Sequence, residues 1–120
     1  MEVAELDREA LKERTLAYIE QMRLRGAPYG RYRYAEGMPA PVLYAPTYAA
    51  MTRHIYGELD GLGDRERREW IGYLQSHQDD DGLFRDPAIY GQQGYAGDPE
   101  WWGRRHLSCH VVTALTCLGR

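Results

Sequence analysis

The chain has 120 residues, of which 43% are hydrophobic and 28% charged, and its formal net charge is −3. This composition is typical of one folded domain, because disordered segments are poor in aromatic residues and this chain has 10 Tyr, 3 Trp and 1 Phe. No run approaches the ~20 apolar residues that a membrane span needs. The slight acidic balance disfavours nucleic acid as a partner, although arginines cluster within residues 65–68 and 104–105.

The first half of the chain shows two helical patterns. The first begins near Asp7, a favourable N-cap residue, and runs to about Leu24. Its apolar stripe consists of Leu11, Thr15, Tyr18, Ile19 and Met22. After a connector rich in Gly, Pro and Tyr over residues 26–46, a second helix is predicted to start at Thr47, directly after Pro46. The stripe of this second helix consists of Tyr48, Met51, Ile55 and Leu59.

The second half repeats this arrangement. Asp64 is the predicted cap of a third helix that ends in the turn-forming run 79–82. Its stripe consists of Trp70, Ile71, Leu74 and Gln78. A second connector precedes a fourth helix from about Arg104 to Leu118. The predicted inward residues of the fourth helix are Leu107, Val111, Ala114, Leu115 and Leu118. Because no stretch alternates apolar and polar residues as a strand does, the predicted fold class is all-α, with four main helices.

The two halves also match residue by residue at offsets of 52 to 56 positions. The matched positions are Met51 with Leu107, His54 with His110, Tyr18-Ile19 with Tyr73-Leu74, and Gly30-Arg31-Tyr32 with Gly82-Leu83-Phe84. Repeats of ~50 residues that bury a face against their neighbours are typical of arrays and closed rings. We therefore predict a single domain over residues 1–120, made of two helical hairpin units over residues 6–63 and 64–119.

The second unit carries a spaced motif at the end of its first helix. The motif residues are Tyr73, Leu74, Gln78, Gly82 and Phe84. They resemble the QW motif of the terpenoid cyclase and protein prenyltransferase β-subunit superfamily, with Phe84 where the motif usually has Trp. The first unit looks like a divergent copy, with Arg23 at the glutamine position. Gln78 is expected to make a buried hydrogen bond at a helix end, so Gln78→Ala would cost about 1 kcal/mol of stability.

This resemblance implies an α/α toroid of two concentric helix layers, built from helical hairpins. Complete rings of that family usually have about six hairpins and this chain supplies two, so the chain is expected to be a piece of a toroid in an isoprenoid-handling system, without a complete catalytic centre. It is then a fragment of a larger protein, a subunit that assembles with copies of itself, or a small bundle with open apolar faces. Two other functions stay open: a non-enzymatic interaction or oligomerisation module, and a carbohydrate-binding or carbohydrate-processing toroid.

Aromatic residues crowd both connectors and form the candidate ligand-binding surface. Aromatic faces attract cations and stack on sugars, and in a cyclase-like ring they would line an apolar cavity for an isoprenoid. The candidate residues are Tyr32, Tyr34, Tyr95, Trp101, Trp102, Arg104 and Arg105. Packing of these side chains within the connectors is the competing interpretation.

Metal binding is a further hypothesis. His106, Cys109 and His110 have the i, i+3, i+4 spacing of one helix face, which suits zinc, and the aspartates at 79–81 suit magnesium, although turn formation also explains them. We expect no cofactor, with zinc or magnesium as the alternative. Cys109 and Cys117 lie ~12 Å apart if one helix carries both, too far for a disulfide between them. Reduced thiols and an N-terminus without an apolar core predict a cytoplasmic protein.

Overall fold

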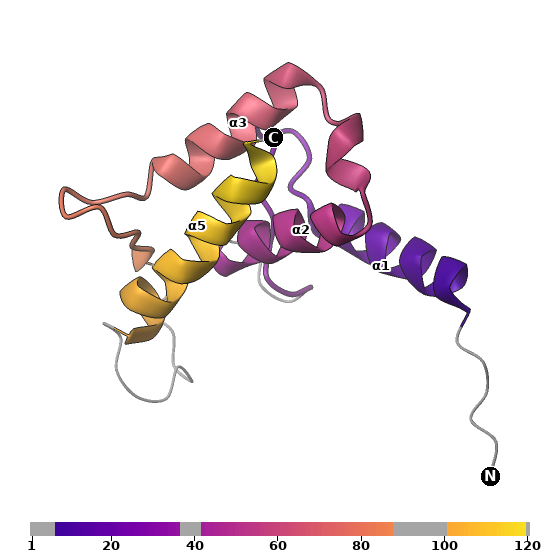
Figure 1. Ribbon diagram of the computed structural model, residues 1–120, viewed down its shortest axis with the longest axis horizontal. Helices are drawn as coiled ribbons and strands as arrows, with labels where there is room; N and C mark the ends of the chain where they lie inside the picture. Colours follow the sequence, from indigo (N-terminus) through magenta and orange to yellow (C-terminus); the bar gives the residue numbers. More distant parts are fainter. Residues whose placement is uncertain (1–6, 37–41, 88–100, 120) are drawn as a thin grey trace, which may run out of the picture.

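The computed structural model describes residues 7–36, 42–87 and 101–119. Within these ranges the chain is helical and forms no strand, which confirms the predicted all-α class. The helices are α1 (Arg8–Met22), α2 (Tyr44–Ile55), α3 (Asp64–Gln75) and α5 (His106–Leu118), with a 3-10 turn η1 (Glu58–Gly61) and a π-helical turn η2 (Trp101–Arg105) (Figure 1). None of the described helices is long and apolar enough to cross a membrane.

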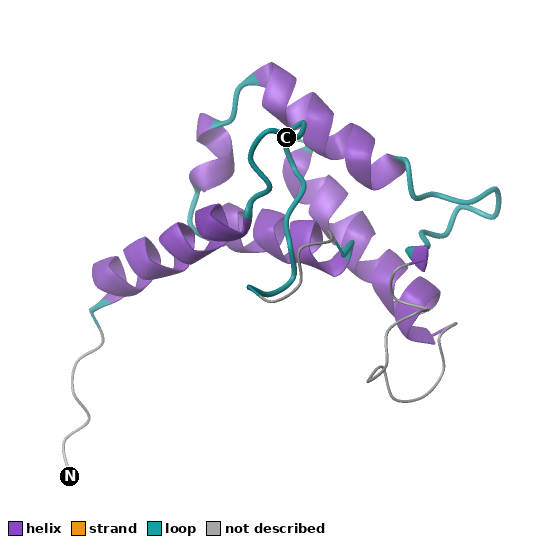
Figure 2. Cartoon of the chain, turned by 180° about the vertical axis from the view of Figure 1, so that it is seen from behind, coloured by secondary structure: helices purple, strands orange, loops and turns teal. Residues whose placement is uncertain are grey.

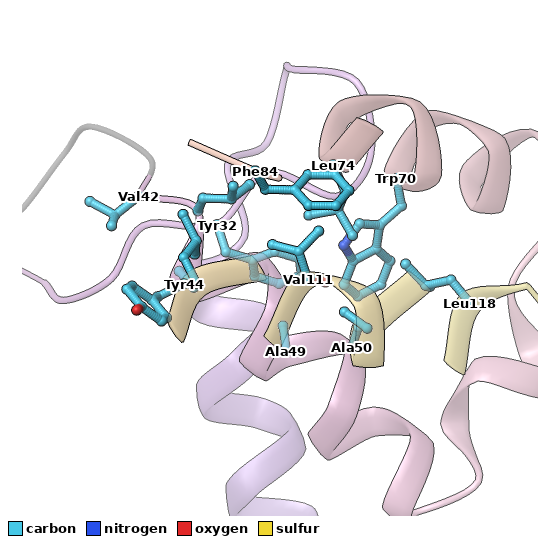
Figure 3. Packing of buried hydrophobic residues seen from close by; sticks show 14 of the residues in the cluster. Tyr32, Val42, Tyr44, Ala49, Ala50, Trp70, Leu74, Phe84, Val111 and Leu118 are labelled. Carbon is cyan, nitrogen blue, oxygen red and sulfur yellow. The ribbon is translucent and has the colours of Figure 1, made fainter. Parts of the chain in front are cut away.

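Helix α5 forms the centre of the hydrophobic core and packs against both α2 and α3 (Figure 1). The inward stripe predicted for this helix is confirmed at four fully buried positions, which are Leu107, Val111, Ala114 and Leu118. From α3, Trp70 and Leu74 are also fully buried and join the same cluster (Figure 3). The 3.6-residue period places each of these sets on one face of its helix.

Helix α2 begins three residues earlier than predicted, at Tyr44 and not at Thr47. The sequence places Pro46 before the helix, whereas in the structure this proline lies inside the first turn. The first four N–H groups of a helix have no intrahelical acceptor, so the missing N–H of a proline costs little there. The helix therefore extends back through the proline.

The buried face predicted for α2 is also wrong. Tyr48 and Ile55 are 40% and 77% exposed. The face that packs toward the core carries small side chains, Ala45, Ala49 and Ala50. Small side chains on this face let α2 pack closely against α5, whereas Tyr48 and Ile55 lie on the outer surface of the helix.

Helix α1 starts as predicted at its N-cap Asp7, whose carboxylate accepts the Ala10 N–H at 3.1 Å. The inward stripe predicted for this helix is wrong at two of its five residues. Met22 is buried at the C-terminal end, whereas Leu11 and Tyr18 are 46% and 52% exposed. The helix extends away from the other helices as an arm (Figure 1; Figure 2).

The turns that follow α1 and α3 have the same construction. Arg23 pairs with Tyr32 in an antiparallel bridge after α1, and Gln78 pairs with Phe84 in the same way after α3. The glycines at matched positions of the two turns, Gly30 (104°) and Gly82 (87°), both have positive φ, and Gly26 (86°) in the first turn does as well. The aromatic ring of each bridge is buried, at 1% exposure for Tyr32 and 2% for Phe84. These are the positions that the sequence repeat matches.

The role predicted for Gln78 is wrong, because this residue lies beyond α3, which ends at Gln75. Its exposed side-chain amide donates to the Gly82 carbonyl oxygen at 2.9 Å, within its own turn. Loss of this bond leaves no buried group without a partner. Asp64 is likewise the first residue of α3 and not its cap, a position taken by Gly63.

Buried polar contacts join the second hairpin, α3 to α5, to the first, α1 to α2. The Asp86 carboxylate, 6% exposed, accepts the Leu43 N–H at 2.7 Å at the start of α2. A negative charge at a helix N-terminus is stabilising, so Asp86 caps a helix of the other hairpin. Within the second hairpin, the Ser108 hydroxyl accepts the Phe84 N–H at 2.8 Å.

Candidate ligand-binding cleft

A cleft of about 200 Å³ lies between α1, the turn that follows α1, and α2. Its lining consists of Tyr18, Ile19 and Met22 from α1, Tyr32, Arg33 and Tyr34 from the turn, and Ala45, Tyr48, Ala49 and Thr52 from α2. Ala45 and Ala49 are one helical turn apart and therefore neighbours on the helix surface, where their small side chains leave room. The aromatic side chains of the lining surround this space.

The turn after α1 positions the middle part of the lining. The Arg33 N–H donates to the carbonyl oxygen of Met22, the last residue of α1, at 3.0 Å, and the Leu24 N–H donates to the Arg31 carbonyl oxygen at 2.8 Å within the turn. The Tyr32 side chain is buried and its hydroxyl accepts a hydrogen bond from Arg53 at 3.2 Å, and burial raises the pKa of Tyr32. Tyr34 is 46% exposed. Tyr32 therefore borders the core, and Tyr34 lies toward solvent.

Arg33 is the charged residue of this lining. Its guanidinium donates one hydrogen bond, from Nη2 to the Gln21 carbonyl oxygen at 3.4 Å, and takes part in none of the ion pairs within the described ranges. Burial, together with the nearby Tyr34, raises the pKa of Tyr48. The Tyr48 phenol is therefore neutral at neutral pH and can donate a hydrogen bond.

Tyr48 also belongs to a ring cluster where α2 meets the start of α5. The members of this ring cluster are Tyr44, Tyr48, Trp101, His106 and His110. The Tyr44 hydroxyl lies 2.8 Å from His106 Nδ1, and the two imidazole centroids are 4.3 Å apart. Burial and, second, the neighbouring His110 lower the pKa of His106. Both effects favour the neutral form of the His106 imidazole.

The structure brings the two histidines of the metal hypothesis together, but not as a metal site. His110 Nδ1 donates to the His106 carbonyl oxygen at 2.9 Å, and Cys109 is exposed as a free thiol. Across the described residues, no group of three or more His, Cys, Asp or Glu side chains is arranged to hold a metal ion. The zinc arrangement predicted from the spacing therefore does not form there.

The aspartate run forms ion pairs around its own turn. Asp79 pairs with Arg85 at 3.4 Å, and Asp81 pairs with Arg104. Arg104, predicted as a ligand-binding residue, therefore joins this turn to η2. Arg105, its neighbour in the same prediction, is exposed.

The predicted ligand-binding residues are divided among different places. Tyr32 and Tyr34 line the cleft. Trp101 belongs to the ring cluster and is 48% exposed. Tyr95 and the side chain of Trp102 lie outside the described residues.

Several cleft residues do not follow from the sequence pattern. Tyr18 and Tyr48 are predicted to lie on buried helix stripes, and Arg33 belongs to none of the motifs found in the sequence. One signal is present in Ala45 and Ala49, because alanines at i and i+4 mark a shallow strip on a helix surface. Helical periodicity alone does not show whether such a strip of alanines borders an open cleft or packs closely against another helix.

Comparison with models of known protein families, with curated proteins and with solved structures finds no match to this chain. Its function is therefore inferred from the cleft, the exposed surfaces and the motif residues.

Proposed function

We propose that the chain is a binding module of an isoprenoid-handling system and that it holds an apolar isoprenoid in the cleft between α1 and α2. The observation that carries this proposal is the cleft lining, in which aliphatic and aromatic side chains surround the space above Ala45 and Ala49. Linings of this kind, with a few polar groups, are typical of small-molecule sites. The QW-like residues of the second hairpin support the isoprenoid class.

The size of the cleft favours a short ligand. Its volume of about 200 Å³ is below the ~300–1,000 Å³ of typical ligand pockets. At the ~30 Å³ that a water molecule occupies in the liquid, this space holds on the order of seven heavy atoms. A ten-carbon isoprenoid such as geraniol has eleven heavy atoms, so the cleft holds the apolar part of the molecule while the remainder, with the polar end, extends beyond its mouth.

The proposal assigns binding to the cleft and no chemical step. The guanidinium of Arg33 stays protonated in proteins, so it does not act as a general base. The raised pKa of Tyr48 keeps its phenol neutral, which removes it as a base at neutral pH. These two residues are suited to hydrogen bonding with a ligand.

Filling the cleft tests the proposal. Thr52→Phe places a ring in the cleft from its α2 wall, and we expect it to weaken geraniol binding by about tenfold or more in isothermal titration calorimetry. Thr113→Phe, at an exposed position of α5 outside the cleft, is the matched control and should bind as the parent does. Absence of binding to the parent chain, or equal affinity of the two variants, would contradict the proposal.

A second function, association with another copy of this chain, is favoured by a separate observation. Large apolar side chains are exposed on three helices, and these are Leu11, Tyr18, Tyr48, Ile55 and Val112. Leu11 and Tyr18 are seven residues apart and therefore lie on one face of α1, and an exposed apolar helix face typically marks a partner site. The native mass of the particle tests this second function.

A further inference from the structure

We propose that the ligand of this cleft carries an anionic head group, a carboxylate or a phosphate, and that Arg33 binds it. This inference depends on the proposed function, because it specifies the ligand of the same cleft. It concerns the head group, whereas the proposed function concerns the apolar body.

The first argument is the unused hydrogen-bonding capacity of Arg33. A guanidinium has five N–H donors, and Arg33 uses one of them, at 3.4 Å. Two other arginines nearby are well occupied: Arg23 pairs with Glu20 at 2.7 Å, and Arg53 donates to the hydroxyls of Tyr29 and Tyr32. Arg33 therefore keeps most of its planar fork available at the cleft, and such a fork matches carboxylate and phosphate oxygens.

The second argument is the charge of the lining. Apart from Arg33, the residues that line the cleft are uncharged, so no carboxylate among them repels an anion. The hydroxyls of Tyr34 and Tyr48 add hydrogen-bond donors to the same lining. An anionic head group thus meets one cation and neutral donors, whereas a cationic head group is repelled by Arg33.

The third argument is that an apolar wall strengthens this attraction. Arg33 is half-buried beside aliphatic and aromatic side chains, so its field is less screened by water than that of an exposed arginine. A ligand whose apolar body fills the cleft also removes water from beside the guanidinium. Body and head group therefore contribute to binding together.

Three probes with the same ten-carbon body separate the two contributions. These are geraniol with a neutral head group, geranic acid with an anionic one, and geranylamine with a cationic one. We expect calorimetry at neutral pH and low salt to show geranic acid binding about tenfold more tightly than geraniol, the effect of one charge-assisted hydrogen bond. Geranylamine should bind most weakly, and added salt should reduce the advantage of geranic acid.

The variant Arg33→Gln should lose the preference for geranic acid over geraniol, because Gln keeps hydrogen-bond donors but carries no charge. Arg25→Gln is the matched control, because it removes the same charge from a 72% exposed side chain that does not line the cleft. Arg25→Gln should keep the preference. Both variants are compared with the parent in thermal unfolding, so that loss of folding is not mistaken for loss of binding.

The possible failures have different meanings. Equal affinity for geraniol and geranic acid, tighter binding of geranylamine, or an unchanged preference in Arg33→Gln would overturn the head-group inference and leave the proposed function standing. If none of the three probes binds the parent chain, the proposed function falls and the inference falls with it.

Discussion

At the scale of single residues, Gly30 is packed directly against Trp70. A Cβ atom there would lie 2.6 Å from Cγ and 2.7 Å from Cα of Trp70, whereas a Cβ at Gly82 would meet no atom within 4 Å. Both glycines have φ in the left-handed region. We expect Gly82→Ala to lower the free energy of unfolding by about 1 kcal/mol through backbone strain. Gly30→Ala should lower it by about 3 kcal/mol, because overpacking against Trp70 adds to the same strain.

Urea unfolding followed by tryptophan fluorescence measures both losses. The pair of variants controls for backbone conformation, since the two turns are built alike and differ in what faces the glycine. Equal losses would mean that Trp70 can move aside at little cost, which would contradict the close packing of the turn against α3.

At the scale of elements, one carboxylate on α3 holds the turn that follows α1. Glu69 accepts the Tyr29 backbone N–H at 2.6 Å and a hydrogen bond from Arg65 at 3.0 Å. The Tyr29 N–H, and then Arg65, lower the pKa of Glu69 from its ordinary value of 4.5. A depressed folded-state pKa contributes stability above the unfolded value, and this contribution is lost as the pH falls through the folded value.

Glu69→Gln is therefore expected to be less stable than the parent at neutral pH. The difference should shrink in acid well below pH 4.5, where the parent carboxylate is also protonated. Thermal unfolding at both pH values measures the difference, and Glu13→Gln, at an exposed position of α1, serves as the control for loss of charge. A gap between Glu69→Gln and the parent that stays constant with pH would contradict this role.

The buried face of a helix can be predicted from the sequence when the same apolar spacing that indicates the helix also marks the side chains that face the core. In α5 the apolar side chains recur at helical spacing, and four of the five predicted inward residues are fully buried. In α2 one apolar face carries large side chains and another carries alanines, so which face is buried depends on the helix that packs against it. The close approach to α5 selects the alanine face, which periodicity cannot show.

The cleft is predictable in part for a similar reason. Tyr32 and Tyr34 follow from the density of tyrosine in the connector, since aromatic residues in a connector indicate a binding or packing surface. Tyr48 and Arg33 do not follow, because the cleft forms where α2 and the turn after α1 meet, and that meeting is a tertiary contact. The spacing of His106 and His110 correctly indicates that they lie close together, but not which atoms bond to them.

At the scale of the whole molecule, the shape is open. The radius of gyration is 15.5 Å, against the roughly 14 Å of a compact domain of this length, and the principal extents are 49 × 39 × 25 Å. The projecting α1, with Leu11 and Tyr18 exposed on it, accounts for part of this extension. An arm with an apolar face is stabilised when another surface covers it.

We therefore expect light scattering on a sizing column to give a mass above the 13.9 kDa of one chain, rising with concentration. Leu11→Glu should lower this mass, because it places a charge in the contact, whereas Ala17→Glu at another exposed position of α1 is the control. A mass near three chains would supply enough hairpins for a closed ring. The mass of one chain at every concentration would contradict association.

The cap of α2 also affects the order in which the protein is completed during synthesis. Asp86 follows Leu43 by 43 residues, so at 5–20 residues per second the ribosome adds the capping carboxylate roughly 2 to 9 s after the residue whose N–H it accepts. Throughout this interval α2 has neither the Asp86 carboxylate at its N-terminus nor α5 to cover its alanine face. The first hairpin therefore reaches its final packing only after the second hairpin has been translated.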